Sequence, residues 1–162
     1  MRLPRAPELP DALVTLSRLQ FLHGFVVVAV ATAIWLPDPV TARPWLDIVP
    51  VLAALYLLLQ TGLYFGAELA RGGRTLAPAA SLLLTACTAT PFLPAWLSTP
   101  LMAVAVMMLF GLEKVGAVRE HWPEAWLRGR KQHMQFVMVS LASVLFWLIS
   151  QDNRALLNAA GG

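Results

Sequence analysis

Five ionisable or polar side chains lie within or beside long apolar runs, toward one end of each run: His23, Glu68, Glu113, Lys114 and Gln135. If those runs cross a membrane, such groups are costly and usually mark proton, ion or solute pathways. Their pattern therefore predicts a polar vestibule shared by four helices. The structural alternative is that the lysine pairs with one of the two glutamates and only neutralises charge near the membrane surface.

The histidines suggest a different chemistry, because two of them could hold a haem between facing helices. His23 lies inside an apolar run and His133 at the edge of another, which makes a haem- or quinone-associated redox anchor an alternative hypothesis. We expect no metal site, since Cys87 and the carboxylates do not cluster with the histidines in sequence. The sequence identifies no cofactor.

Motifs of catalysis are absent from the sequence. It contains no Gly-x-Ser-x-Gly, no His-Glu-x-x-His and no glycine-rich phosphate loop. We therefore predict no catalytic residue, and the sequence leans toward a protein that is not an enzyme.

The elements that must position these side chains are apolar runs of roughly the length that a membrane-crossing helix needs, about 20 residues for about 30 Å of hydrocarbon. A chain inside lipid must satisfy its own backbone hydrogen bonds, so long apolar runs predict helices. We expect an all-α, polytopic bundle of five transmembrane helices, forming one membrane domain over residues 1–162. The expected helices are at about 11–36, 47–69, 76–97, 100–118 and 133–150, with an interfacial segment at about 119–132.

Basic residues predict the orientation of this bundle, because short cytoplasmic loops collect lysine and arginine. With five helices, all of the 12 basic residues except Arg43 and Arg154 fall on one side. With the third and fourth runs merged into one helix, the basic residues divide evenly. The pattern therefore predicts a multi-pass protein of the cell inner (plasma) membrane, with a cytoplasmic N-terminus and an external C-terminus.

Composition supports the same class. The chain is 58% hydrophobic and 13% charged, about half the charged share of an average soluble protein. The sequence pI of about 9.6 would suit nucleic acid, but the basic residues lie where membrane topology requires them. We therefore expect the lipid bilayer, and no nucleic acid, as a partner.

Two local patterns predict contacts. Gly62 and Gly66 share one helix face and would let a neighbouring helix approach closely, with internal packing favoured over contact with another chain. The connection before the last helix combines aromatic and basic residues, which indicates either a surface for lipid or a protein partner or an anchor that only follows the positive-inside rule. Its residues are Trp122, Trp126, Arg128, Arg130 and Lys131.

Two functional hypotheses follow. The first is a non-enzymatic accessory or assembly component of a membrane complex, in contact with other membrane subunits or with a second copy. The second is a small carrier or channel for a proton, an ion or a small solute, which would use the polar vestibule. If Glu68 and Glu113 faced each other around a cavity, the second hypothesis would be favoured.

Overall fold

A computed structural model describes the chain at residues 11–35, 39–114, 118 and 122–160. Within those residues the fold consists of helices without any strand. The α-helices are α1 (Asp11–Ala33), α2 (Pro39–Leu69), α3 (Ala77–Ala89), α4 (Ala95–Leu112) and α6 (Glu124–Ala160), and a short 3-10 helix, η1 (Thr90–Phe92), follows α3.

Four of these helices contain segments long and apolar enough to cross a membrane. The segments are Leu13–Ala33, Pro44–Leu69, Ala95–Leu112 and Glu124–Gln151, whereas the apolar run Ala77–Phe92 is shorter. By length and composition, the chain is an all-helical, multi-pass membrane protein.

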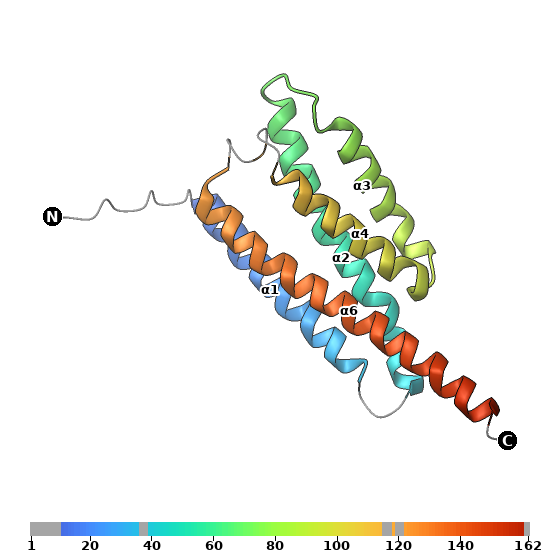
Figure 1. The fold of residues 1–162 in the computed structure, drawn as a ribbon. Coiled ribbons are helices and arrows are strands. Elements are labelled where there is room, and N and C mark those ends of the chain that lie inside the picture. Colours follow the sequence, from blue (N-terminus) through green and yellow to red (C-terminus); the bar gives the residue numbers. More distant parts are fainter. Residues whose placement is uncertain (1–10, 36–38, 115–117, 119–121, 161–162) are drawn as a thin grey trace.

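The helices run side by side, with successive helices pointing in opposite directions (Figure 1). Helix α2 is central, since it contacts α1, α3, α4 and α6. Helices α1 and α6 form the most extensive pair, and α3 and α4 form a hairpin on the other side of α2. This arrangement directs one face of α2 and one face of α6 into the middle of the bundle.

The core lies along these inward faces, and apolar side chains also cover the outside. Val49 and Leu57 of α2 and Leu141 of α6 are fully buried. Yet Val104 and Val139 are 68% and 67% exposed. A helix surrounded by lipid has an apolar residue on either face, so exposed valines are the expected outer surface of a membrane bundle.

The structure corrects the ends of the predicted helices. The third ends at Ala89 instead of 97, because Pro94 forces Leu93 into an extended conformation (φ −103°, ψ 141°). The fourth begins at Ala95 and carries Pro100 inside it. Residues 124–132, expected to form a separate interfacial segment, are instead the first turns of α6.

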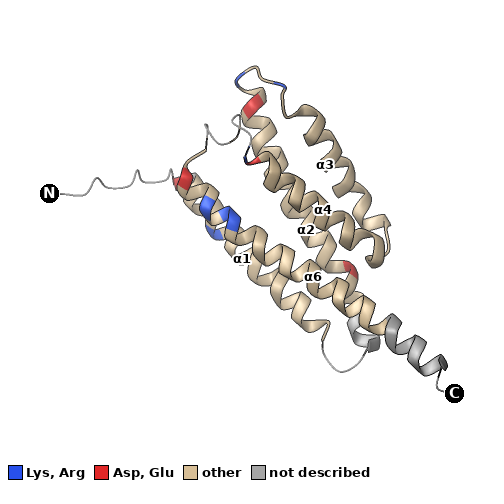
Figure 2. Cartoon of the chain, in the orientation of Figure 1, with Lys and Arg blue, Asp and Glu red and all other residues tan. Residues whose placement is uncertain are grey.

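The lysines and arginines coloured in Figure 2 gather toward one end of the bundle, whereas Asp47, near the start of α2, lies toward the other end. Figure 2 shows the coloured lysines and arginines at the end that holds the start of α1, the start of α6 and the α2–α3 turn. In the described part of the chain, the polar residues at this end are therefore close enough to meet across helices.

Candidate functional site

A buried ion pair joins α4 to α6. The Arg130 Nη1 atom lies 2.6 Å from Oε1 of Glu113, and the two side chains are 0% and 9% exposed. Glu113 directly follows the last residue of α4, whereas Arg130 lies in the second turn of α6. Each charge would be costly alone in this position, and each neutralises the other.

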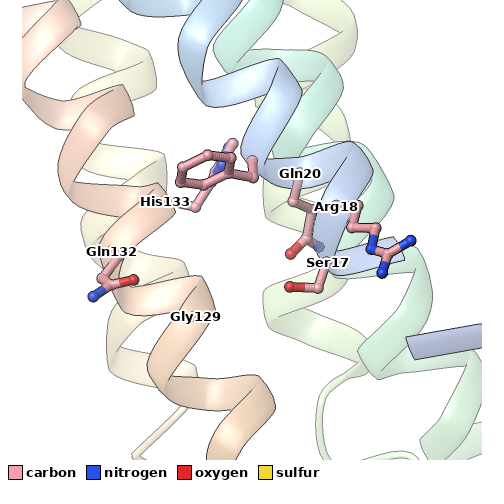
Figure 3. Close-up of a pocket in the computed structure, with 7 residues that line it drawn as sticks. Ser17, Arg18, Gln20, Gly129, Gln132 and His133 are labelled. Atoms are coloured by element: carbon pink, nitrogen blue, oxygen red, sulfur yellow. The ribbon is translucent and has the colours of Figure 1, made fainter. Parts of the chain in front are cut away.

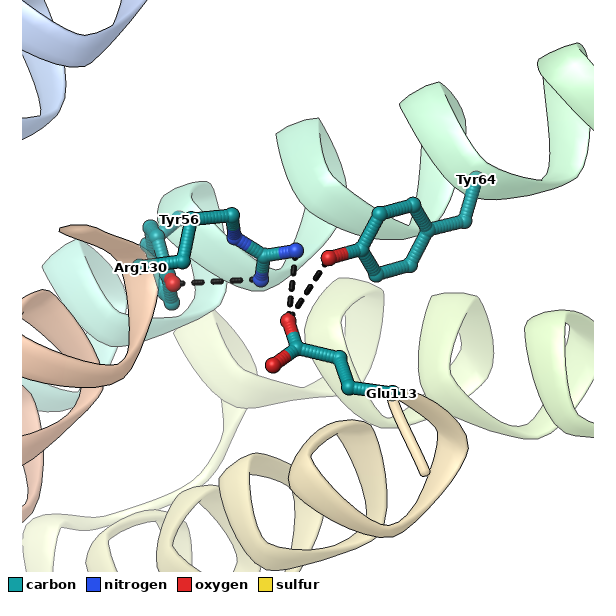
Figure 4. A network of polar contacts seen from close by, with 4 residues as sticks. All are labelled: Tyr56, Tyr64, Glu113 and Arg130. Atoms are coloured by element: carbon teal, nitrogen blue, oxygen red, sulfur yellow. Dashed lines mark hydrogen bonds and ion pairs between the residues drawn. The ribbon is translucent and has the colours of Figure 1, made fainter. Parts of the chain in front are cut away.

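Two tyrosines of α2 also bond to this pair (Figure 4), whereas Nε of Arg130 has no hydrogen-bond partner among the described residues. The hydroxyl of Tyr64 donates to Oε1 of Glu113 at 2.7 Å, and Nη2 of Arg130 donates to the hydroxyl of Tyr56 at 3.2 Å. The guanidinium also lies 4.6 Å from the centre of the Tyr64 ring, a cation–π contact. The network therefore fixes α2, α4 and α6 relative to one another.

The spacing of these α2 residues explains why they meet the pair. Tyr56, Gln60 and Tyr64 are spaced four residues apart along α2, so they form a polar stripe on one helix face. Gln60 is fully buried between them, and neither its amide nitrogen nor its amide oxygen has a hydrogen-bond partner among the described residues.

Tryptophan rings lie beside the ion pair, toward the start of α6. Trp126 is 2% exposed and precedes Arg130 by four residues, so the two share a face of α6. The ring of Trp122 stacks on Trp126 with centroids 5.9 Å apart and meets Tyr64 edge-on at 5.3 Å. This cover holds water away from the charges and so strengthens their attraction.

A pair of histidines extends the network toward α1. Nδ1 of His23 lies 3.2 Å from Nε2 of His133, and Nε2 of His23 lies 3.1 Å from the carbonyl oxygen of Leu52. A carbonyl can only accept, so Nε2 of a neutral His23 carries the proton, and its Nδ1 accepts from His133. The His133 ring in turn packs on Tyr56, with centroids 4.3 Å apart.

A glycine of α1 lies where the two helices that carry the histidines, α1 and α6, approach each other closely. A Cβ atom added to Gly24 would lie 3.1 Å from Nδ1 of His133 and 3.3 Å from a ring carbon of Phe136. Gly24 therefore lies where α1 packs closely on α6, at the level of the histidine pair, and a side chain there would press on His133 and Phe136.

This arrangement does not fit a haem between His23 and His133. Two metal–nitrogen bonds of about 2 Å each would separate the coordinating nitrogens by about 4 Å. The facing nitrogens lie 3.2 Å apart and bond to each other. Backbone and side-chain atoms pack directly beside them, so the helices would have to separate to admit a macrocycle.

The other predicted vestibule residues lie elsewhere, so the five do not form one chamber. Glu68 accepts hydrogen bonds from the backbone amides of Thr75 and Leu76, at 2.7 and 2.8 Å, and so stabilises the α2–α3 turn. Lys114 and Gln135 are exposed beside the groove between α4 and α6. Glu68 and Glu113 thus have separate partners and do not face each other.

Clefts flank α6 on two sides. One, between α1 and α6, has a volume of about 290 Å³ and is lined by Ser17, Gln20, Gly129 and His133 among others (Figure 3). The second, between α4 and α6, has a volume of about 360 Å³ and includes Glu113 and Arg128. The buried network therefore reaches one cleft at His133 and the other at Glu113.

The predicted docking residues divide between buried and exposed positions. Trp126 and Arg130 are buried inside the bundle, so they are not available to lipid or to a protein partner. Trp122 is partly buried, and Arg128 and Lys131 are exposed. This division follows from the continuous helix α6, because Trp126 and Arg130 are four residues apart and so share its inward face.

The glycine pair is placed differently from the prediction of internal packing. Gly62 and Gly66 are exposed on α2, and a Cβ atom added to either would meet nothing within 4 Å. Leu55, Leu59 and Leu69, on neighbouring positions of the same helix, are 54%, 45% and 48% exposed. In the described chain, the face that carries the glycines is therefore open.

Sequence reasoning gave Arg130 a surface role and assigned none to Tyr56 or Tyr64. A signal was present: the chain has only two tyrosines, eight residues apart in one apolar run. That spacing places both hydroxyls on one face of a helix that has few other polar groups.

Comparison with known proteins found no matching family model, no matching curated protein and no matching solved structure.

Proposed function

We propose that this chain is a five-span protein of the cell inner (plasma) membrane that acts as a non-enzymatic accessory or assembly component of a membrane complex. The observation that carries the proposal is the open glycine face of α2. Glycines four residues apart let another helix approach the backbone closely, and van der Waals packing then drives association inside lipid. Because α2 already contacts four helices of its own chain, a helix of another chain would be the fifth.

The five crossings are supported by the hairpin of α3 and α4. Helix α4 has 18 residues, which rise about 27 Å, and α3 has 13, which rise about 20 Å. The two are antiparallel and joined through η1, so α3 and η1 together traverse nearly the same depth as α4. The gathering of basic residues at one end supports a cytoplasmic N-terminus.

Cysteine labelling tests the topology. In a Cys87→Ser background, a membrane-impermeant maleimide should label Phe92→Cys in intact cells and Arg71→Cys only after permeabilisation. Phe92 is 87% exposed in η1, between α3 and α4, and Arg71 is exposed in the α2–α3 turn, so both positions lie at helix ends where a thiol can react. Labelling of both from the same side would refute the crossing of α3.

Site-specific photocrosslinking tests the accessory function. A photoreactive residue at Gly62 should capture a membrane protein, either another subunit or a second copy, and the double variant Gly62→Leu/Gly66→Leu should purify without it. Ala142→Leu is the matched control, since it enlarges an exposed small residue on α6. A stable, lone monomer of the natural chain in mild detergent would count against the proposal.

The second candidate is a carrier for a proton or a small solute. It is favoured by the buried polar groups between two clefts: His133 lines one cleft and packs on Tyr56, and Glu113, which lines the other, pairs with Arg130. Proteoliposomes that contain the Glu113→Gln variant should then lose flux, whereas Glu68→Gln should keep it, because Glu68 only accepts bonds in a turn. Equal flux from the natural chain and Glu113→Gln would remove Glu113 from any transport mechanism.

A further inference from the structure

The groove between α4 and α6 changes in character along its length. The part nearer the charged end of the bundle has a volume of about 360 Å³ and is lined by three cations, Lys114, Arg128 and Lys131. The deeper part, about 190 Å³, is lined mostly by apolar side chains, including Met107 and Met138. Phe110 and Lys131 line both parts, so the two hollows adjoin and form one groove.

Each wall of the groove follows a helical row. On α6, Arg128, Lys131, Gln135 and Met138 are three, four and three residues apart, so they lie on one face and pass from charged to apolar. On the α4 side, the row passes from Lys114 through Phe110 to Met107. The ends of α4 and α6 that bear charge lie together, so both walls become apolar in the same direction.

The charges at the mouth of the groove are available to a ligand. Lys114, Arg128 and Lys131 are exposed, and the ammonium of Lys114 lies over the Phe110 ring at 4.8 Å from its centre. Two carboxylates also line this part. Glu113 is neutralised by Arg130, which leaves Glu124 against three cations, so the mouth is positively charged.

From this gradient we propose that the α4–α6 groove binds one anionic phospholipid. The phosphate of the lipid lies among Lys114, Arg128 and Lys131, and an acyl chain lies along Met107 and Met138. Charge complementarity selects the headgroup, and the apolar part selects an amphiphile over a soluble anion. A zwitterionic lipid such as phosphatidylcholine also carries a phosphate, but the three cations repel its ammonium group, so a lipid with net negative charge is preferred. The proposal concerns a groove on the opposite side of α6 from α1 and does not depend on the glycine face of α2.

The test uses the purified full chain, stripped of lipid in detergent, and native mass spectrometry with dioleoyl phosphatidylglycerol. We expect one molecule of this lipid to be retained, in preference to phosphatidylcholine with the same chains. Each basic residue near a lipid phosphate contributes roughly fivefold in affinity, so the triple variant Lys114→Gln/Arg128→Gln/Lys131→Gln should bind about 100-fold more weakly.

The matched control is Arg71→Gln/Arg74→Gln, which removes exposed charge from the α2–α3 turn at the same end of the bundle. This control should bind as the natural chain does, and equal weakening would refute the groove, because it would mean a diffuse attraction to charge. Met107→Trp tests the deeper part, since it fills the apolar wall and should lower retention while the charges stay in place.

Three further outcomes would overturn the proposal. Equal retention of phosphatidylcholine would show that the charges do not select the headgroup. If inorganic phosphate raised the thermal midpoint as much as phosphatidylglycerol does, the groove would be an anion site in which the acyl chain has no role. A dimer that persists in phosphatidylglycerol, and is lost in Met107→Trp, would show that a second copy occupies the groove. A thermal midpoint of the lipid-free triple variant equal to that of the natural chain confirms that its fold is intact.

Discussion

Removal of one partner of the Arg130–Glu113 pair should destabilise the bundle strongly. The nitrogen and oxygen are 2.6 Å apart and almost completely buried, so Arg130→Met leaves a carboxylate without its counter-charge. Loss of one member of a buried pair typically costs about 3–5 kcal/mol. The same substitution also removes the bond to Tyr56 and the stacking on Tyr64, so we expect the upper part of this range.

Replacement of both partners should cost much less. Arg130→Met/Glu113→Leu removes the attraction together with both desolvation penalties, and such exchanges are often close to neutral. The two single costs together should therefore exceed the cost of the double variant by at least about 3 kcal/mol, which is the coupling free energy of the double-mutant cycle. Arg128→Met, two residues earlier and exposed, is the matched control and should change the free energy of unfolding by less than about 0.5 kcal/mol.

The assay is unfolding by sodium dodecyl sulfate in mixed micelles, followed by circular dichroism. Additive costs of the two single substitutions would refute the reasoning, because they would show that the two side chains do not interact. A cost of Arg130→Met no larger than that of Arg128→Met would show that the guanidinium reaches water.

Three smaller perturbations test other contacts by the same unfolding assay. Gly24→Ala should cost about 1–3 kcal/mol, because its Cβ would lie only 3.1 Å from the ring of His133. Gly129→Ala should be neutral or stabilising, since its nearest neighbour would lie 3.9 Å away, and the reverse order would refute the crossing. Tyr64→Phe removes the hydroxyl that donates to Glu113 and should cost about 1.5–3 kcal/mol, and no loss would show that this bond is absent. Glu68→Ala should speed amide hydrogen exchange in the α2–α3 turn, and unchanged exchange would show that the carboxylate does not hold it.

The network explains how a bundle with apolar faces acquires a defined arrangement. Apolar contacts between helices in lipid are only weakly specific, because lipid chains are as apolar as leucine. A guanidinium that must meet one carboxylate, one hydroxyl and the face of one aromatic ring is satisfied in far fewer arrangements. The network on α2, α4 and α6 therefore fixes the arrangement of these helices, whether or not protons also move through it.

The sequence by itself determined the helical class of this protein and the approximate position of each apolar run. Lipid imposes that result, because a run such as the one around Leu57 or Leu141 can bury its backbone polar groups only as a helix. The sequence also indicated the end at which charged residues gather. Helix ends were less certain, since the effect of Pro94 on Leu93 and the continuity of α6 through residues 124–132 depend on local backbone conformation.

Only the tertiary structure decided which residues meet. In a soluble protein the polar face of a helix points outward, so the opposite face is known to point inward. Here both faces are apolar: on α4, Val104 is exposed and Val106 is buried. The apolar pattern of the sequence therefore cannot show which face of α2 or α6 turns toward the middle of the bundle. That rotation buries Arg130 against Glu113 and turns Gly62 outward. It also separates Glu68 from the network, because backbone amides in its own turn reach its carboxylate first.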